Sequence, residues 1–245
     1  MKMRIIEILL IAGIFLFLIL FILQINNNKK IDYYSVSNDI IKNNNQIYTA
    51  LYINLDSRKD RKEQIEDELE KQEFYNFVRF DAVKDQRKGY IGCSKSHLEC
   101  IKIAKENQYP YVIIFEDDFE FLVDKNEFHN LLNKLLNVDY DVFILSYNTT
   151  SNDIYPTEDP LLYTIKNTQT ASGYIVNRRY YDKLINNFQE GIDLLVETDE
   201  YSNYAIDQYW KRLQDVDIWL CYKKRLGKQR ASYSDIEKRE VDYQV

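Results

Sequence analysis

Residues 111–118 read Tyr-Val-Ile-Ile-Phe-Glu-Asp-Asp, an apolar run that ends in three consecutive acids. An uninterrupted apolar run of this length is typical of a β-strand buried on both faces. Glu116 and Asp118 would point to the same side, because side-chain direction in a strand repeats every two residues. Two such carboxylates repel unless a cation lies between them, and Mg²⁺ or Mn²⁺ prefers oxygen ligands. The stretch therefore predicts a metal site, with a solvated loop after a strand as the alternative.

On either side of this stretch, predicted strands alternate with predicted helices. Short runs rich in β-branched and aromatic residues predict strands at 48–55, 77–83, 141–145, 161–165, 173–176 and 218–222. Helices are predicted at 58–72, 92–107, 127–136, 178–188 and 205–213. The alternation indicates an α/β fold with a single, mostly parallel sheet flanked by helices. Ligands of such sheets bind beyond the carboxyl ends of the strands, where the acids at 116–118 lie.

A second polar segment lies where the first predicted strand meets the first predicted helix. It contains Asn54, Asp56 and Arg58, with Arg61 one turn later. Backbone N–H groups and the helix dipole at such a turn can receive a phosphate, and the arginines could add charge. The alternative is a helix cap with surface ion pairs. The segment has no glycine-rich phosphate loop, which argues against a P-loop or Rossmann nucleotide site.

Two further segments carry reactive side chains. Residues 92–97 read Gly-Cys-Ser-Lys-Ser-His and are expected to open a helix. Ser94 or Ser96 could cap this helix, and Gly92 could let the backbone approach a ligand; the alternative is a cap beside an ordinary, partly buried His97. Asp207, flanked by aromatic residues on a predicted helix, could act as a general base, although by itself it has the features of any surface aspartate.

Composition excludes some classes of protein. The formal net charge is −7 and the isoelectric point is about 5.1, which argues against general nucleic-acid binding. The chain has three cysteines and no Cys-x-x-Cys pair, which argues against a disulfide framework or a zinc site. Small, buried apolar side chains are therefore the expected role of the cysteines.

The amino-terminal segment is strongly apolar. The run from Ile8 to Leu23 is just long enough to cross a bilayer, and no small-residue cleavage site follows it. We therefore expect an uncleaved transmembrane signal-anchor at 1–25, a polar linker at 26–46 and a catalytic domain at 47–245. The protein would be a single-pass membrane protein, and the nearly balanced flanking charges leave its orientation open.

Taken in order, these segments resemble glycosyltransferase family 25, the lipooligosaccharide and collagen-type sugar transferases. The matching stretches are 52–61, 80–83, 91–97, 116–118, 171–184, Asp207, Gln229 and 234–236. No single stretch decides the resemblance, but their shared order along nearly the whole domain is highly specific.

The resemblance implies a GT-A fold and transfer of a hexose, galactose or glucose, from a UDP-sugar. The acceptor would be a glycan or a protein-linked sugar, the reaction would invert the anomeric carbon, and Mn²⁺ or Mg²⁺ would be the cofactor. Glu116 and Asp118 would hold the metal, with Asp117 at the ribose or the metal. The implied nucleotide-sugar contacts are Asn54, Asp56, Arg58, Gly92, Ser96 and His97. Asp207 would be the general base, with Asp235 as the second choice.

Two segments, 147–159 and 189–204, show no family motif, so the acceptor stays open. One rival function is an inactive relative that binds sugar or protein, against which the intact acids at 116–118 and Asp207 argue. The other is a different metal-dependent nucleotide-diphosphate enzyme, which more often has a glycine-rich phosphate loop.

Overall fold

The computed structural model describes residues 49–149 and 153–243. The expected anchor at 1–25 and linker at 26–46 lie outside these residues. Within the described part of the chain, no helix combines the length and the apolar character that a membrane span needs.

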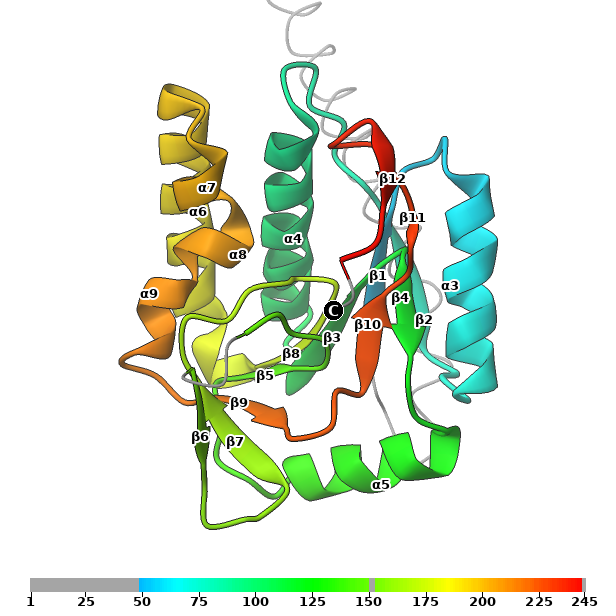
Figure 1. The fold of residues 1–245 in the computed structure, drawn as a ribbon, viewed down its shortest axis with the longest axis vertical. Coiled ribbons are helices and arrows are strands. Elements are labelled where there is room, and N and C mark those ends of the chain that lie inside the picture. Colours follow the sequence, from blue (N-terminus) through cyan, green and yellow to red (C-terminus); the bar gives the residue numbers. More distant parts are fainter. Residues whose placement is uncertain (1–48, 150–152, 244–245) are drawn as a thin grey trace, which may run out of the picture. The chain divides into compact units, whose positions relative to one another are not determined.

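One eight-stranded sheet forms the centre of the domain (Figure 1). Across the sheet the strands are β2 (Phe77–Asp81), β1 (Ala50–Asn54), β3 (Tyr111–Glu116), β8 (Gly173–Asn177), β5 (Val142–Ile144), β9 (Trp219–Tyr222), β7 (Leu162–Ile165) and β6 (Ile154–Pro156). β1 is parallel to β2 and β3, and β5 is parallel to β9. β8 and β7 are antiparallel to both of their neighbours. Six of the eight strands therefore run in one direction, which confirms a mostly parallel sheet in an α/β fold.

Helices cover both faces of this sheet. The longer ones are α3 (Lys59–Lys71), α4 (Gly89–Glu106), α5 (Lys125–Leu135) and α6 (Tyr181–Thr198), the last preceded by the 3₁₀ turn η1 (Arg178–Tyr180). Three short helices follow: α7 (Tyr201–Tyr204), α8 (Ile206–Tyr209) and α9 (Lys211–Gln214). Two small antiparallel pairs complete the domain: β4 (Phe119–Phe121) with β10 (Gly227–Gln229), and β11 (Ser232–Ser234) with β12 (Arg239–Val241).

The alternation of side chains along the central strands divides the core into two layers. On β3, Val112 and Ile114 pack with α4 and α6, whereas Ile113 and Phe115 pack with α3 and α5. Both sets are fully buried, as the unbroken apolar run predicted. In Figure 1, α4 and α6 accordingly lie on one side of β1 and β3, and α3 lies on the other.

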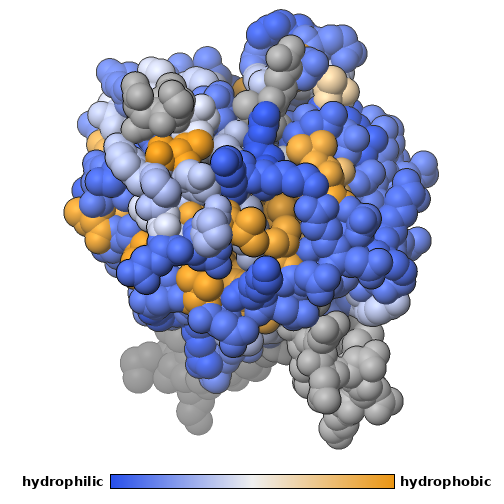
Figure 2. All heavy atoms as spheres, turned by 60° about the horizontal axis from the view of Figure 1, so that its bottom comes forward, coloured by the Kyte–Doolittle hydropathy of each residue, from blue (hydrophilic) through white to orange (hydrophobic). Residues whose placement is uncertain are grey.

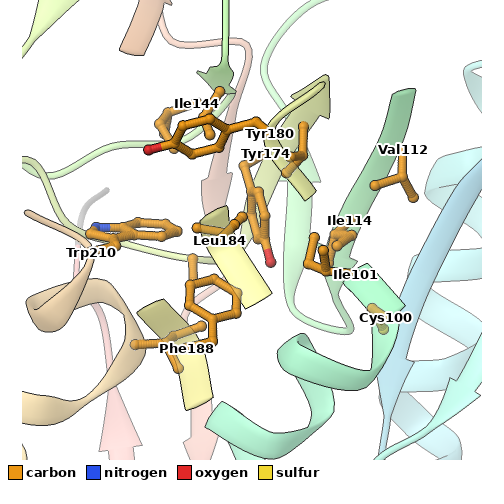
Figure 3. Packing of buried hydrophobic residues seen from close by; sticks show 14 of the residues in the cluster. Cys100, Ile101, Val112, Ile114, Ile144, Tyr174, Tyr180, Leu184, Phe188 and Trp210 are labelled. Carbon is orange, nitrogen blue, oxygen red and sulfur yellow. The ribbon is translucent and has the colours of Figure 1, made fainter. Parts of the chain in front are cut away.

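The layer under α6 contains a group of aromatic side chains (Figure 3). The ring of Trp210 meets that of Tyr174 edge-on at 5.6 Å between centroids, and both side chains are fully buried. The indole N–H of Trp210 donates to the carbonyl of Thr168 at 2.9 Å, so its polar atom is satisfied. This contact holds the loop before β8 against the short helices α8 and α9.

The outer surface is mostly hydrophilic, in keeping with the acidic composition. On the face shown in Figure 2, apolar side chains gather in small, separated patches within a hydrophilic surround. Scattered exposed apolar side chains are usual on protein surfaces.

Several boundaries differ from the sequence predictions. The helix expected at 92–107 begins at Gly89, so Ser94 and Ser96 lie inside α4 and the expected cap is wrong; the residue before the helix, Lys88, makes no side-chain cap. The helix expected at 178–188 continues to Thr198, and the one expected at 205–213 consists of two short helices. The small strands β4, β6, β10, β11 and β12 were not predicted, because no continuous apolar run of strand length marks them in the sequence.

Candidate active site

The three acids lie directly beyond the carboxyl end of the central strand β3. Glu116 is the last residue of that strand, and the next two acids form the turn into β4. Gln229 on β10 reaches over this turn, and its amide nitrogen lies 3.4 Å from Glu116 Oε2 and 3.4 Å from Asp118 Oδ2. Two acids separated by one residue thus converge on one amide, although Asp118 lies in the turn rather than on the strand.

Arg61, in the first half of α3, supplies positive charge to this turn. Its Nη1 lies 3.0 Å from Asp117 Oδ1 and 3.2 Å from Asp118 Oδ2. The amide of Asn54, at the end of β1, donates to Asp117 Oδ2 at 2.7 Å. Both oxygens of Asp117 are therefore engaged, whereas Asp118 Oδ1 is buried without a hydrogen-bond partner among the described residues.

Burial and mutual repulsion give these three acids different pKa values. Burial, followed by the charge of Glu116, raises the pKa of Asp118 to about 7. Burial also raises the pKa of Asp117, although Arg61 and Asn54 oppose the shift. Burial acts to raise the pKa of Glu116 as well, but the hydrogen bond and charge of His97 outweigh it, so this pKa lies below its ordinary value. The turn therefore holds an ionised Glu116 beside a carboxyl whose ionisation the fold opposes.

A pocket of about 370 Å³ opens beside this turn. Glu116 and Asp207 both line it, although the two residues lie far apart in the sequence. Gln229 and the tyrosines Tyr90 and Tyr201 also line it. The pocket thus brings together one candidate metal ligand and the first candidate for the general base.

Asp207 is held in place by the loop before β8. Its Oδ2 accepts the backbone N–H of Thr170 at 3.1 Å, and the side-chain amide of Gln208 lies 3.4 Å from its Oδ1. Thr170 has φ of +90°, which is rare for a β-branched residue and indicates local backbone strain at the pocket wall. Burial raises the pKa of Asp207, with the Thr170 N–H acting in the opposite direction.

The second candidate base lies outside this arrangement. Asp235 Oδ2 pairs with Arg58 Nη1 at 2.6 Å, and the same guanidinium also contacts Asp60 and the carbonyl of Tyr233. The ion pair ties the β11–β12 segment to the turn before α3. Asp56 is exposed, and its nearest described cation, Arg79, lies 3.7 Å away. Arg58 and Asp235 thus form an ion pair with each other.

Gly92 and Ser96 lie on α4 and pack against the segment that follows β2. Ser96 Oγ accepts the backbone N–H of Val83 at 2.8 Å and donates to the carbonyl of Gly92 at 2.8 Å. A Cβ added at Gly92 would lie 2.3 Å from the carbonyl oxygen of Val83, so the close approach that glycine permits here is to protein backbone. Gly92 and Ser96 thus join α4 to the segment that follows β2, and their contact with a nucleotide-sugar stays a prediction.

His97 acts through Glu116. The ring is fully buried, with Nε2 3.0 Å from Glu116 Oε1 and Nδ1 2.9 Å from the hydroxyl of Tyr174. The histidine thus sits behind a pocket-lining carboxylate. Sequence reasoning gave no role to Tyr90, Tyr201 or Thr170, because single tyrosines and threonines carry no local signal.

A hard divalent cation fits the acids of this turn. The unpartnered Oδ1 of buried Asp118 is an oxygen donor with no described proton donor to satisfy it. Glu116 and Asp118 supply carboxylate oxygens on one side of the turn, which is the ligand type that Mn²⁺ and Mg²⁺ prefer.

The family model for glycosyltransferase family 25 (LPS biosynthesis protein) matches residues 87–208. The chain belongs to glycosyltransferase family 25. The matched residues include α4, the acids at 116–118 and Asp207. The protein is accordingly a glycosyltransferase.

The chain also resembles several solved structures at low identity. The glycosyltransferase GlyE of Streptococcus pneumoniae TIGR4 is 10% identical, with a TM-score of 0.47 over 73% of this chain and 46% of GlyE. A glycosyltransferase involved in the glycosylation of the major capsid of PBCV-1 is 11% identical, with a TM-score of 0.38 over 72% and 93% of the two chains. A197 from STIV is 10% identical, with a TM-score of 0.43 over 71% and 81%. No curated protein is significantly similar to the chain in sequence.

Proposed function

We propose that this glycosyltransferase moves a hexose, galactose or glucose, from a UDP-sugar to a hydroxyl of a glycan or protein-linked acceptor. The reaction inverts the anomeric carbon and uses Mn²⁺ or Mg²⁺ in a GT-A-type domain spanning 47–245. One observation carries the proposal: Glu116 and Asp207 line the same pocket of about 370 Å³. A pocket lined by both a candidate cation ligand and a partly buried carboxylate suits a displacement between two bound substrates.

Glu116 and Asp118 are the residues that would hold the cation. Its chemistry there would be that of a Lewis acid that neutralises the diphosphate leaving group. The unpartnered oxygen of Asp118 and its raised pKa support this role, because a cation would supply the charge that this carboxyl lacks.

Asp207 is the proposed general base. The acceptor oxygen attacks the anomeric carbon and gives its proton to Asp207, while the bond from that carbon to the diphosphate breaks and its electron pair leaves with UDP. The Thr170 N–H fixes one oxygen of Asp207, so the carboxylate is oriented before the acceptor binds. Burial raises the pKa of Asp207 toward the working pH, which favours proton transfer.

The donor side of the site is the turn between β1 and α3. Asp117 bonds both Asn54 and Arg61, so it positions an amide and a guanidinium beside the acids. Arg61 can attract the diphosphate, and Asp56 and Arg58 lie on the same turn for the nucleoside. This assignment keeps the nucleotide on the β1 side and leaves the Asp207 side for the acceptor.

We also propose that residues 1–25 anchor the enzyme in a membrane as a single-pass protein and that 26–46 form a linker. The uncleaved apolar run supports this. Full-length protein should sediment with membranes and resist carbonate extraction, whereas a chain that begins near Ile47 should stay in the supernatant. A full-length protein that is released by carbonate would contradict the anchor.

A screen of UDP-sugars for Mn²⁺-dependent release of UDP tests the function. Asp207→Asn should lose about 10²–10⁴-fold in turnover while it still binds UDP and Mn²⁺. The matched control is Asp215→Asn, at an exposed aspartate after α9 whose nearest described cation, Lys166, is 3.7 Å away; it should behave as wild type. Near-normal turnover in Asp207→Asn would remove this residue from the mechanism, and the absence of release with every UDP-sugar would refute the donor class.

A further inference from the structure

One turn of α4 brings a thiol and an imidazole onto the same carboxylate. Cys93 Sγ lies 3.6 Å from Glu116 Oε1, and His97 Nε2 lies 3.0 Å from that oxygen. The three ligand atoms all lie within 4.8 Å of one another. The sequence contains no zinc-binding motif, because the third ligand, Glu116, comes from β3 and lies far from Cys93 and His97 in the sequence.

These distances are close to those of a tetrahedral zinc site. With bonds of about 2.0–2.3 Å, neighbouring ligand atoms around Zn²⁺ lie roughly 3.3–3.8 Å apart. The Cys93–Glu116 distance of 3.6 Å already falls in this range, and the His97–Glu116 distance of 3.0 Å needs to widen by a few tenths of an ångström. Cys93 Sγ and His97 Nε2 lie within 4.8 Å of each other, so movements of these side chains by about an ångström would complete the geometry.

The imidazole is oriented as a metal ligand requires. The hydroxyl of Tyr174, 2.9 Å from His97 Nδ1, keeps Nε2 turned toward Glu116, and the two rings stack at 5.7 Å. A hydrogen bond to the second nitrogen of a ligating histidine is a common feature of protein metal sites.

The cluster is open on one side. Cys93 and Glu116 line the pocket, whereas His97 is closed behind them. An ion bound here would have three protein ligands and a fourth position toward the pocket, which is the pattern of an exchangeable rather than a closed zinc site. Thiolate and imidazole favour Zn²⁺ over the harder Mn²⁺ or Mg²⁺.

We propose that Cys93, His97 and Glu116 form a binding site for Zn²⁺, separate in its ligand chemistry from the oxygen-ligand site of the acidic turn. On binding, the Cys93 thiol releases its proton to solvent. The imidazole then carries its proton on Nδ1, and this N–H donates a hydrogen bond to the hydroxyl oxygen of Tyr174. Because Glu116 belongs to both sites, Zn²⁺ inhibits sugar transfer; this consequence rests on the proposed function, whereas the binding itself does not.

Alkylation of the full-length protein by iodoacetamide tests the binding. Cys93 is partly exposed, and Cys100 and Cys221 are fully buried, so the native protein should be alkylated at Cys93 first. Equimolar Zn²⁺ should protect Cys93, and Mg²⁺ should not. Equal labelling of Cys93 with and without Zn²⁺, read by peptide mass spectrometry, overturns the proposal.

Co²⁺ provides a second readout that needs no turnover. The protein and the control Cys221→Ser should give a thiolate-to-cobalt charge-transfer band that Cys93→Ser and His97→Gln lack. Tyr174→Phe should keep the band but bind Zn²⁺ about 10–100-fold more weakly. A band that persists in Cys93→Ser overturns the site. Mn²⁺-dependent release of UDP, measured separately in zinc-free buffer, shows whether the proposed function stands, whatever the cobalt result.

Discussion

Replacement of Asp118 by Asn should stabilise the metal-free protein at alkaline pH and abolish its stabilisation by Mn²⁺. Asp118 is only 7% exposed, and one of its oxygens has no partner in the described part of the chain. Burial and the neighbouring Glu116 raise its pKa from 3.8 to about 7. Asparagine has nearly the same shape but cannot ionise, so it removes the cost of burying this charge.

The sign follows from proton linkage. Because the folded pKa lies above the unfolded value, the folded chain holds one more proton between pH 3.8 and about 7, and stability falls as pH rises through this window. About three pH units at roughly 1.4 kcal/mol each give a loss of at most about 4 kcal/mol above pH 7. For a domain of this size, that loss corresponds to roughly 10 °C in melting temperature.

Thermal unfolding at pH 5 and pH 8, in EDTA and in MnCl₂, measures both effects. Wild type should melt lower at pH 8 than at pH 5 in EDTA and should recover with Mn²⁺, which binds the ionised carboxylates. Asp118→Asn should show a smaller pH difference and no Mn²⁺ shift, and Asp215→Asn should match wild type. The reasoning fails if Asp118→Asn melts with wild type at pH 8 or still responds fully to Mn²⁺.

Three other substitutions test separate parts of the structure. Asp235→Asn breaks the pair with Arg58 but should keep most of the UDP-release turnover, since Asp235 does not line the pocket; a loss as large as that of Asp207→Asn would reverse the assignment of the base. Gly227→Ala places a Cβ 2.0 Å from the ring of Phe119, so urea unfolding should show a loss of about 1–3 kcal/mol. Trp210→Phe removes the indole donor to the Thr168 carbonyl, which keeps the side-chain amide of Gln214 at 2.8 Å, so the loss should be about 0.5–1.5 kcal/mol in the same assay.

The sequence predicted those parts of the site whose signal is local. The run at 111–118 contains both the buried strand and the acids that follow it, so one stretch indicates a strand, its burial and its polar end. The seven strands predicted from apolar runs all lie in the central sheet, and each of their ends falls within two residues of the prediction. Local pattern suffices here because burial on both faces requires a continuous apolar run.

What the sequence did not predict depends on contacts between distant segments. The antiparallel direction of β8 follows from its pairing with β3 and β5, and no residue within β8 specifies it. The hydrogen bond from Thr170 to Asp207 depends on a loop with a strained φ, which no composition rule gives for threonine. The start of α4 at Gly89 was missed because Lys88 offers no capping side chain. The spacing of hydrophobic residues along the sequence indicates which side chains are buried. The features above depend instead on residues that are distant in sequence and close in space.

The support beneath the acidic turn explains why two glycines are needed far from it in the sequence. Phe119 follows the acids directly, is fully buried, and packs on Phe115 at 4.7 Å between ring centroids. A Cβ at Gly173 or at Gly227 would lie 2.3 Å or 2.0 Å from its ring, so only glycine lets β8 and β10 close on both sides of it. The three acids thus lie in the chain between two buried rings that pack on each other, which fixes both ends of the turn. With the turn supported in this way, a bound cation would offset the repulsion between the acids without rearrangement of the chain.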